Sequence, residues 1–135
     1  MKPIKKSACF VKGIIIVSVI FFLTDCSKVR DLGVYDKSIP PNQQCTLFID
    51  KNLTVTRFNG KWVRWSIGQF RTKGEAKIQI PAGHHEFRVN FSEYDASTRE
   101  IHYVKKINVS KNLKAGDIYH LSSFRTWNKV EVLIY

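Results

Sequence analysis

Apolar and polar residues alternate with a period of two from about residue 44 to the C-terminus, and no helical period of 3.6 is found there. The clearest example is residues 84–91. Its apolar row consists of His85, Phe87, Val89 and Phe91, and its other row is His84, Glu86, Arg88 and Asn90. Such alternation predicts a half-buried strand, with Phe87 and Val89, and Ile107 from a later row, facing an opposite sheet.

Further strands are predicted by alternating or β-branched runs. These runs are 45–49, 53–58, 61–65, 76–80, 101–109, 118–124 and 130–134. Asn59-Gly60 predicts a tight hairpin between two of them. Seven or eight short strands joined by turns predict an all-β fold, a small antiparallel β-sandwich that spans residues 44–135. Cys45 shares a row with Leu47 and Ile49, so we expect its thiol to be buried.

Residues 26–43 have few apolar side chains and contain Gly33, Pro40 and Pro41. This composition predicts a flexible tether in front of the domain, because such a segment buries little apolar surface.

The first 25 residues have the pattern of an export signal. Four lysines precede the apolar run Gly13–Leu23, which is too short to cross a hydrocarbon core of about 30 Å comfortably as a helix. The run ends in Leu23-Thr24-Asp25-Cys26, which resembles the lipobox of bacterial lipoproteins, with Asp25 where Gly, Ala or Ser is usual. Relaxed lipoboxes of this kind resemble those of spirochaetes.

The lipobox resemblance implies that residues 1–25 are removed and that a lipid on Cys26 holds the domain to a membrane of the bacterial envelope, in the periplasm or at the surface. An uncleaved N-terminal anchor and an ordinary secretory signal are the alternatives. Without lipidation, Cys26 could form a disulfide with Cys45.

The chain of 135 residues carries 22 Lys and Arg against 11 Asp and Glu. Removal of residues 1–25 takes away four lysines and one aspartate, which leaves a net charge of +8. No basic run exceeds Lys105-Lys106, so the chain lacks a basic arm for nucleic acid. We expect an envelope protein or an anionic glycan or lipid as the partner, beside the membrane itself.

Two segments resemble small bacterial surface β-sandwiches of the PEGA type and the related DUF2846-like lipoprotein domains. They are Ile78-Gln79-Ile80-Pro81-Ala82-Gly83-His84-His85-Glu86-Phe87 and Leu113-Lys114-Ala115-Gly116-Asp117-Ile118-Tyr119-His120-Leu121, and the Asn59-Gly60-Lys61 hairpin matches as well. The resemblance covers residues 45–124. It implies an envelope-associated binding or structural module.

The sequence contains no recognisable set of catalytic residues. The sequence has no nucleophile elbow, no Cys beside a plausible base and no close carboxylate pair, so we expect a protein that is not an enzyme and has no cofactor. His84 and His85 are adjacent and point to opposite faces of a strand, so they cannot chelate one ion together. Cross-strand pairing of His85 with His120, or of His84 with His102, lacks further ligands, and we expect no metal site.

Aromatic and basic residues lie close together in two places. The first contains Trp62, Arg64 and Trp65, with Phe70 and Arg71 further on, and the second is Phe124-Arg125-Thr126-Trp127. Trp and Arg anchor interfaces and stack on sugar rings. We therefore predict one binding rim formed by Trp62, Arg64, Trp65, Arg125 and Trp127. The expected function is a non-catalytic binding or assembly module; the alternative is a small ligand carrier or enzyme with a pocket between the sheets.

Overall fold

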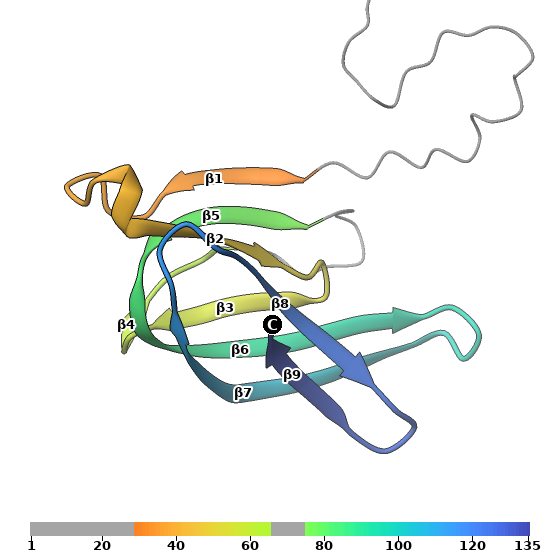
Figure 1. The fold of residues 1–135 in the computed structure, drawn as a ribbon. Coiled ribbons are helices and arrows are strands. Elements are labelled where there is room, and N and C mark those ends of the chain that lie inside the picture. Colours follow the sequence, from red (N-terminus) through yellow and green to blue (C-terminus); the bar gives the residue numbers. More distant parts are fainter. Residues whose placement is uncertain (1–28, 66–74) are drawn as a thin grey trace, which may run out of the picture.

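Two β-sheets packed face to face form the domain (Figure 1). The structure is a computed structural model, and it describes residues 29–65 and 75–135. The strands are β1 (Arg30–Val34), β2 (Gln44–Ile49), β3 (Leu53–Phe58), β4 (Lys61–Trp62), β5 (Ala76–Pro81), β6 (Gly83–Asp95), β7 (Glu100–Leu113), β8 (Ile118–Arg125) and β9 (Val130–Ile134). A single turn of 3₁₀ helix, η2 (Pro41–Gln43), precedes β2. The predicted small β-sandwich is confirmed.

The five-stranded sheet has the order β1-β5-β2-β8-β9, and the four-stranded sheet has the order β4-β3-β6-β7. Neighbouring strands are antiparallel except in two pairs, β1 with β5 and β2 with β8. The sandwich is therefore mostly antiparallel. In the described part of the chain, no helix is long and apolar enough to cross a membrane.

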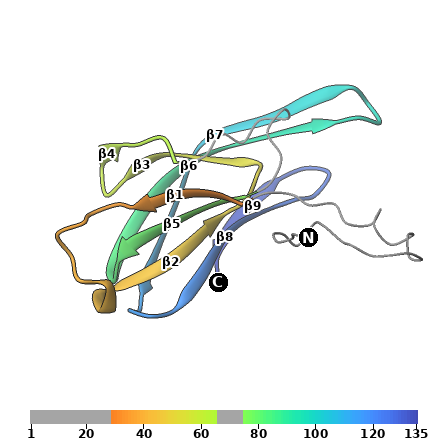
Figure 2. The same cartoon turned by 90° about the horizontal axis from the view of Figure 1, so that it is seen from above.

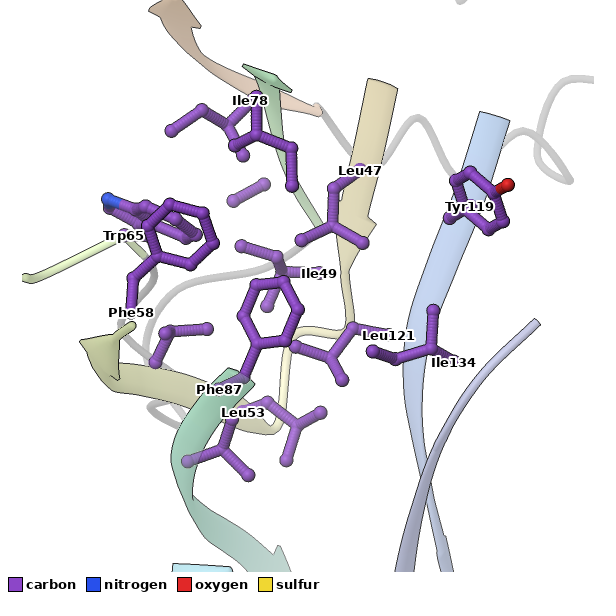
Figure 3. Close-up of a cluster of buried hydrophobic side chains, with 14 of the residues drawn as sticks. Leu47, Ile49, Leu53, Phe58, Trp65, Ile78, Phe87, Tyr119, Leu121 and Ile134 are labelled. Atoms are coloured by element: carbon purple, nitrogen blue, oxygen red, sulfur yellow. The ribbon is translucent and has the colours of Figure 1, made fainter. Parts of the chain in front are cut away.

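The core lies between the sheets and is built from the inward rows of the strands (Figure 3). Phe87 and Val89 are fully buried, as predicted, and Ile107 is partly buried against the same cluster. The predicted row Cys45, Leu47 and Ile49 is fully buried as well. Period-two alternation thus identified the inward faces of β2 and β6 correctly, because one face of each strand is covered by the other sheet.

Cys45 is the free thiol of the described residues. Its Sγ lies 3.6 Å from the carbonyl oxygen of Ile80 on the neighbouring strand β5. Burial raises the pKa of this thiol, because the charged thiolate loses its hydration in the core. The thiol therefore stays protonated and unreactive while the domain is folded.

Residues 30–43, which the sequence assigns to the tether, are part of the domain. Strand β1 pairs in parallel with β5 at the edge of the five-stranded sheet. Tyr35 then packs edge-on against Phe58 and Trp65, with ring centroids 4.9 and 5.5 Å apart. The Gln44 side chain donates a hydrogen bond of 2.7 Å to the Ile39 carbonyl oxygen. The tether boundary at residue 43 is therefore wrong for this stretch, since an edge strand needs few apolar residues to pair.

The sandwich has two different ends (Figures 1 and 2). At one end lie β4 and η2, and we call it the β4 end. At the other end, the β6–β7 and β8–β9 hairpins turn back at residues 96–99 and 126–129, and β1 begins at Arg30. We call this the hairpin end. Both views place the two turns and the start of β1 on the same side of the molecule.

Candidate functional site

An open groove of about 420 Å³ lies on the outer face of the four-stranded sheet. It is lined by Arg57, Gly60, Glu86, Phe87, Arg88, Asn108, Val109 and Ser110. These residues come from β3, the turn after it, β6 and β7. Most of the lining side chains are polar, in contrast to the packed core on the opposite face of the same sheet.

A β-bulge in β3 positions the first arginine of this groove. Val55 pairs with Val89, whereas Arg57 pairs with Arg88, so Thr56 is an extra residue on β3. Simple alternation from Leu53 and Val55 would have turned Arg57 into the core. The bulge instead places Arg57 on the outer face and buries Phe58, because each extra residue reverses the alternation beyond it.

Arg57 and Arg88 are consequently direct neighbours across two strands. Arg57 donates from Nη1 to the Gly60 carbonyl oxygen at 3.0 Å, and its guanidinium lies 4.1 Å from the centre of the Trp62 ring. Arg88 donates from Nε to Oδ1 of Asn108 at 3.2 Å. Among the described residues, no carboxylate forms a salt bridge with either guanidinium.

One donor of this pair has no partner in residues 29–65 and 75–135. Nε of Arg57 is buried and has no hydrogen bond within the described part of the chain. A guanidinium offers five N–H donors in a planar fork, and only one from each of the two arginines is bound to a group of the described chain. The remaining donors and the two positive charges suit a carboxylate or phosphate group, which binds guanidinium in a bidentate manner.

Trp62 borders the arginine pair. It pairs with Arg57 across β3 and β4, and 72% of its side chain is exposed. An exposed indole beside hydrogen-bonding groups is a platform on which a sugar ring or another flat ring can stack. Asn108, Ser110 and Glu86 add donors and acceptors for hydroxyl groups along the groove.

Asn59 fixes the turn at the margin of the groove. Its backbone has a φ of 52°, and its Oδ1 accepts a hydrogen bond of 2.9 Å from the backbone N–H of Glu86. Its Nδ2 lies 2.9 Å from Nδ1 of His85, and Nε2 of His85 lies 2.6 Å from the Pro81 carbonyl oxygen. Since a carbonyl only accepts, His85 carries its proton on Nε2 and accepts from Asn59 at Nδ1.

Trp62 and Trp65 were both predicted for the binding rim, but Trp62 is exposed and Trp65 is buried. Trp65 is only 6% exposed and packs against Phe58 and Phe87 in the core. Its assignment to the rim is therefore wrong. The regular strand ends at Trp62, so the chain leaves the sheet and brings Trp65 inward. Arg64 is exposed just after β4.

Arg125 and Trp127, the other predicted rim residues, do not lie beside Trp62. Arg125 donates from Nε to Oε1 of Glu93 at 2.7 Å and from Nη2 to Oδ2 of Asp95 at 3.3 Å, which raises the pKa of Arg125 further. Its guanidinium is paired with these two carboxylates and offers no free charge to a ligand, so Arg125 is not a rim residue. Trp127 is at the hairpin end, opposite β4, and the two aromatic patches do not form one rim (Figures 1 and 2). Cys26, Phe70 and Arg71 lie outside the described residues.

Histidines of the described residues do not converge. His85 is buried on the inner face of β6, as predicted, whereas His120 stacks between Phe48 and Tyr135 on β8. His102 lies 3.7 Å from Asp95. Within residues 29–65 and 75–135, no three His, Cys, Asp or Glu side chains are close enough to hold a metal ion.

The pairing of Arg57 with Trp62 could be predicted from the sequence. A two-residue Asn59-Gly60 loop pairs Phe58 with Lys61 and Arg57 with Trp62, which is the observed register. Arg88 carried no such signal, because it comes from a strand far along the chain. Comparisons of the chain with protein-family models, with curated proteins and with solved structures find no match.

Proposed function

We propose that this protein is a lipid-anchored, non-catalytic module of the bacterial cell envelope, and that its groove binds an acidic glycan. The export signal and the resemblance of Leu23–Cys26 to a lipobox support the anchor and the location. The resemblance to PEGA-type and DUF2846-like domains supports a binding or structural role.

The observation that carries the binding proposal is the pair Arg57 and Arg88, opposite each other in an outer groove, with no carboxylate of the described residues bound to either. Two adjacent guanidiniums form the chemical complement of a carboxylate or phosphate substituent. The exposed Trp62 beside them supplies a stacking surface for the sugar ring that bears it.

A carrier with a pocket between the sheets is the alternative from the sequence. The space between the sheets in the described residues is occupied by the cluster of buried side chains, and the groove lies on an outer face. No observation in this part of the chain favours the carrier.

The binding proposal is tested with full-length protein in detergent and an oligogalacturonate as the acidic probe. Each lost charge-assisted contact costs about 1.5–3 kcal/mol, so Arg57→Gln and Arg88→Gln should each weaken binding roughly tenfold or more. Lys51→Gln removes the same charge from the exposed β2–β3 turn, away from the groove, and should leave the affinity nearly unchanged. A neutral oligosaccharide of equal length should bind poorly.

Equal losses in all three variants would mean that net charge alone attracts the probe, and would overturn the groove as the site. Binding of neutral and acidic probes with the same affinity would overturn the acidic substituent as the recognised group.

The anchor is tested separately by mass spectrometry of the membrane-bound protein. A lipid-modified Cys26 should be the N-terminal residue, and Cys26→Ala should release the protein from the membrane. Detection of the intact Met1–Lys28 region in the membrane fraction would overturn this part of the proposal.

A further inference from the structure

Exposed aromatic and apolar side chains gather at the hairpin end of the sandwich. Trp127, in the β8–β9 turn, is 90% exposed. Phe124 on β8 and three residues near the β6–β7 turn are about half exposed, and those three are Tyr94, Ile101 and Tyr103. Exposed large apolar side chains that cluster in this way mark an interaction surface.

The strand register places the three hairpin residues on one face. Tyr94 pairs with Ile101, and Tyr103 pairs with Ser92, two residues before Tyr94. Side chains at alternate positions of paired strands share a face, so Tyr94, Ile101 and Tyr103 point the same way. Lys105 extends along the ring of Tyr103, with its Nζ 5.4 Å from the ring centre.

Arg125 holds the two hairpins together. It lies at the end of β8 and binds Glu93 and Asp95 near the end of β6, on strands of different sheets. The β8–β9 turn with Trp127 is therefore fixed beside the β6–β7 hairpin with Tyr94 and Tyr103. The exposed side chains at the tips of these two hairpins make up what we call the hairpin-end surface: Tyr94, Ile101, Tyr103 and Trp127.

The chain enters the domain at this same end. Strand β1, which starts at Arg30, begins on the side of the molecule from which both hairpins project (Figures 1 and 2). Arg30 lies four positions after Cys26 in the chain. An extended chain spans at most ~3.5 Å per residue, so a lipid on Cys26 lies within roughly 14 Å of Arg30.

The geometry points to the hairpin-end surface as a membrane-contacting face, seated in the headgroup region of the bilayer that holds the lipid on Cys26. This inference rests on the proposed lipid anchor. Trp and Tyr are enriched at the level of lipid headgroups, where their rings are partly apolar and their N–H and O–H groups reach water. Lys105, Lys106 and Lys129 lie near these rings along the chain, as is common at membrane surfaces.

One consequence is a fixed orientation of the domain. With the hairpin end on the bilayer, the β4 end with Trp62 and Arg57 points away from the membrane (Figure 1). The groove would then be presented to the envelope polymer space and not to the lipid.

The test uses full-length, membrane-extracted protein reconstituted in phosphatidylcholine vesicles with or without brominated acyl chains. Bromine quenches only tryptophans at the bilayer. We compare wild type, Trp127→Phe and Trp62→Phe, because both side chains are highly exposed and lie at opposite ends of the sandwich. Flotation on a density gradient is measured in the same samples.

Bromine-dependent quenching should occur in wild type, be retained in Trp62→Phe and be mostly lost in Trp127→Phe. Protein that floats with the vesicles but shows no quenching, or loses it equally in both variants, would overturn the inference and leave the lipid anchor standing. Protein that does not float with vesicles would overturn the anchor, and with it the inference.

Discussion

Arg57 and Arg88 face each other as a directly paired couple on β3 and β6, so two positive charges lie side by side with no carboxylate bound to either among the described residues. Like charges directly opposite on neighbouring strands destabilise a sheet. The fold tolerates this cost at the groove, and the proposed binding of an acidic group by the two arginines would offset it when the ligand is present.

Arg88→Gln should therefore stabilise the free protein. We expect the free energy of unfolding at low ionic strength to rise by about 0.2–1 kcal/mol, because the repulsion with Arg57 is removed. Sulfate should raise the melting temperature of wild type more than that of the variant, since the anion bridges the two guanidiniums. Chemical denaturation with and without sulfate measures both effects, and Lys51→Gln is the control. A variant less stable than wild type at low salt would contradict the prediction.

Trp65 and Trp62 should differ sharply in their contribution to stability. Trp65→Ala removes a buried ring that packs on Phe58 and Phe87, and should cost about 3–5 kcal/mol. Trp62→Ala removes an exposed ring whose contact with the Arg57 guanidinium is worth about 0.5–1 kcal/mol. Urea unfolding of both variants measures the difference. Similar losses would mean that the chain does not turn inward after β4.

Asn59 allows backbone strain to be separated from side-chain hydrogen bonding. Asn59→Gly removes the bonds to Glu86 and His85 but tolerates the φ of 52°, and should cost about 1–3 kcal/mol. Asn59→Ala loses the same bonds and adds about 1–2 kcal/mol for the left-handed conformation. Thermal unfolding of the two variants gives the difference. An alanine variant as stable as the glycine variant would exclude strain at this turn.

Acid should destabilise the domain partly through Asp95 and Asp36. Hydrogen bonds from Ser97 and Ser38 hold the pKa of the respective carboxyl groups below the usual range. A lowered folded pKa adds stability that is fully present above the unfolded value of about 3.9 and is lost as pH falls through the folded pKa. Ser97→Ala with Ser38→Ala should make the decline in melting temperature below about pH 4 shallower than in wild type. An unchanged acid profile would contradict this assignment.

The inward rows of β2 and β6 could be predicted from sequence. One side of each strand is buried and the other faces solvent, which produces alternating apolar and polar residues. Strand β1 could not be, because it is an exposed edge strand in which only Leu32 reaches the core cluster. Its pairing with β5 is parallel and made by backbone groups, which leave no periodic signal in the side chains.

The candidate site was predictable only in part. Trp62 was predicted for the binding rim together with Trp65, so the sequence did not distinguish the exposed ring from the buried one. The position of Arg57 depends on the bulge at Thr56, which reverses the alternation without any marker in the sequence. Arg88 reaches the groove through the pairing of β3 with β6. The choice of partner strand is a property of the whole fold, so local patterns cannot give it.

The buried thiol of Cys45 would make the proposed lipid-anchored form a reporter of its own unfolding. Removal of residues 1–25 and attachment of the lipid to the sulfur of Cys26 would leave Cys45 as the sole alkylatable sulfur. Because this thiol is 1% exposed, a maleimide reacts with it only during excursions that separate β2 from β5. If the proposed anchor holds, the rate of labelling in intact membranes would therefore measure how often the core opens, without any introduced cysteine.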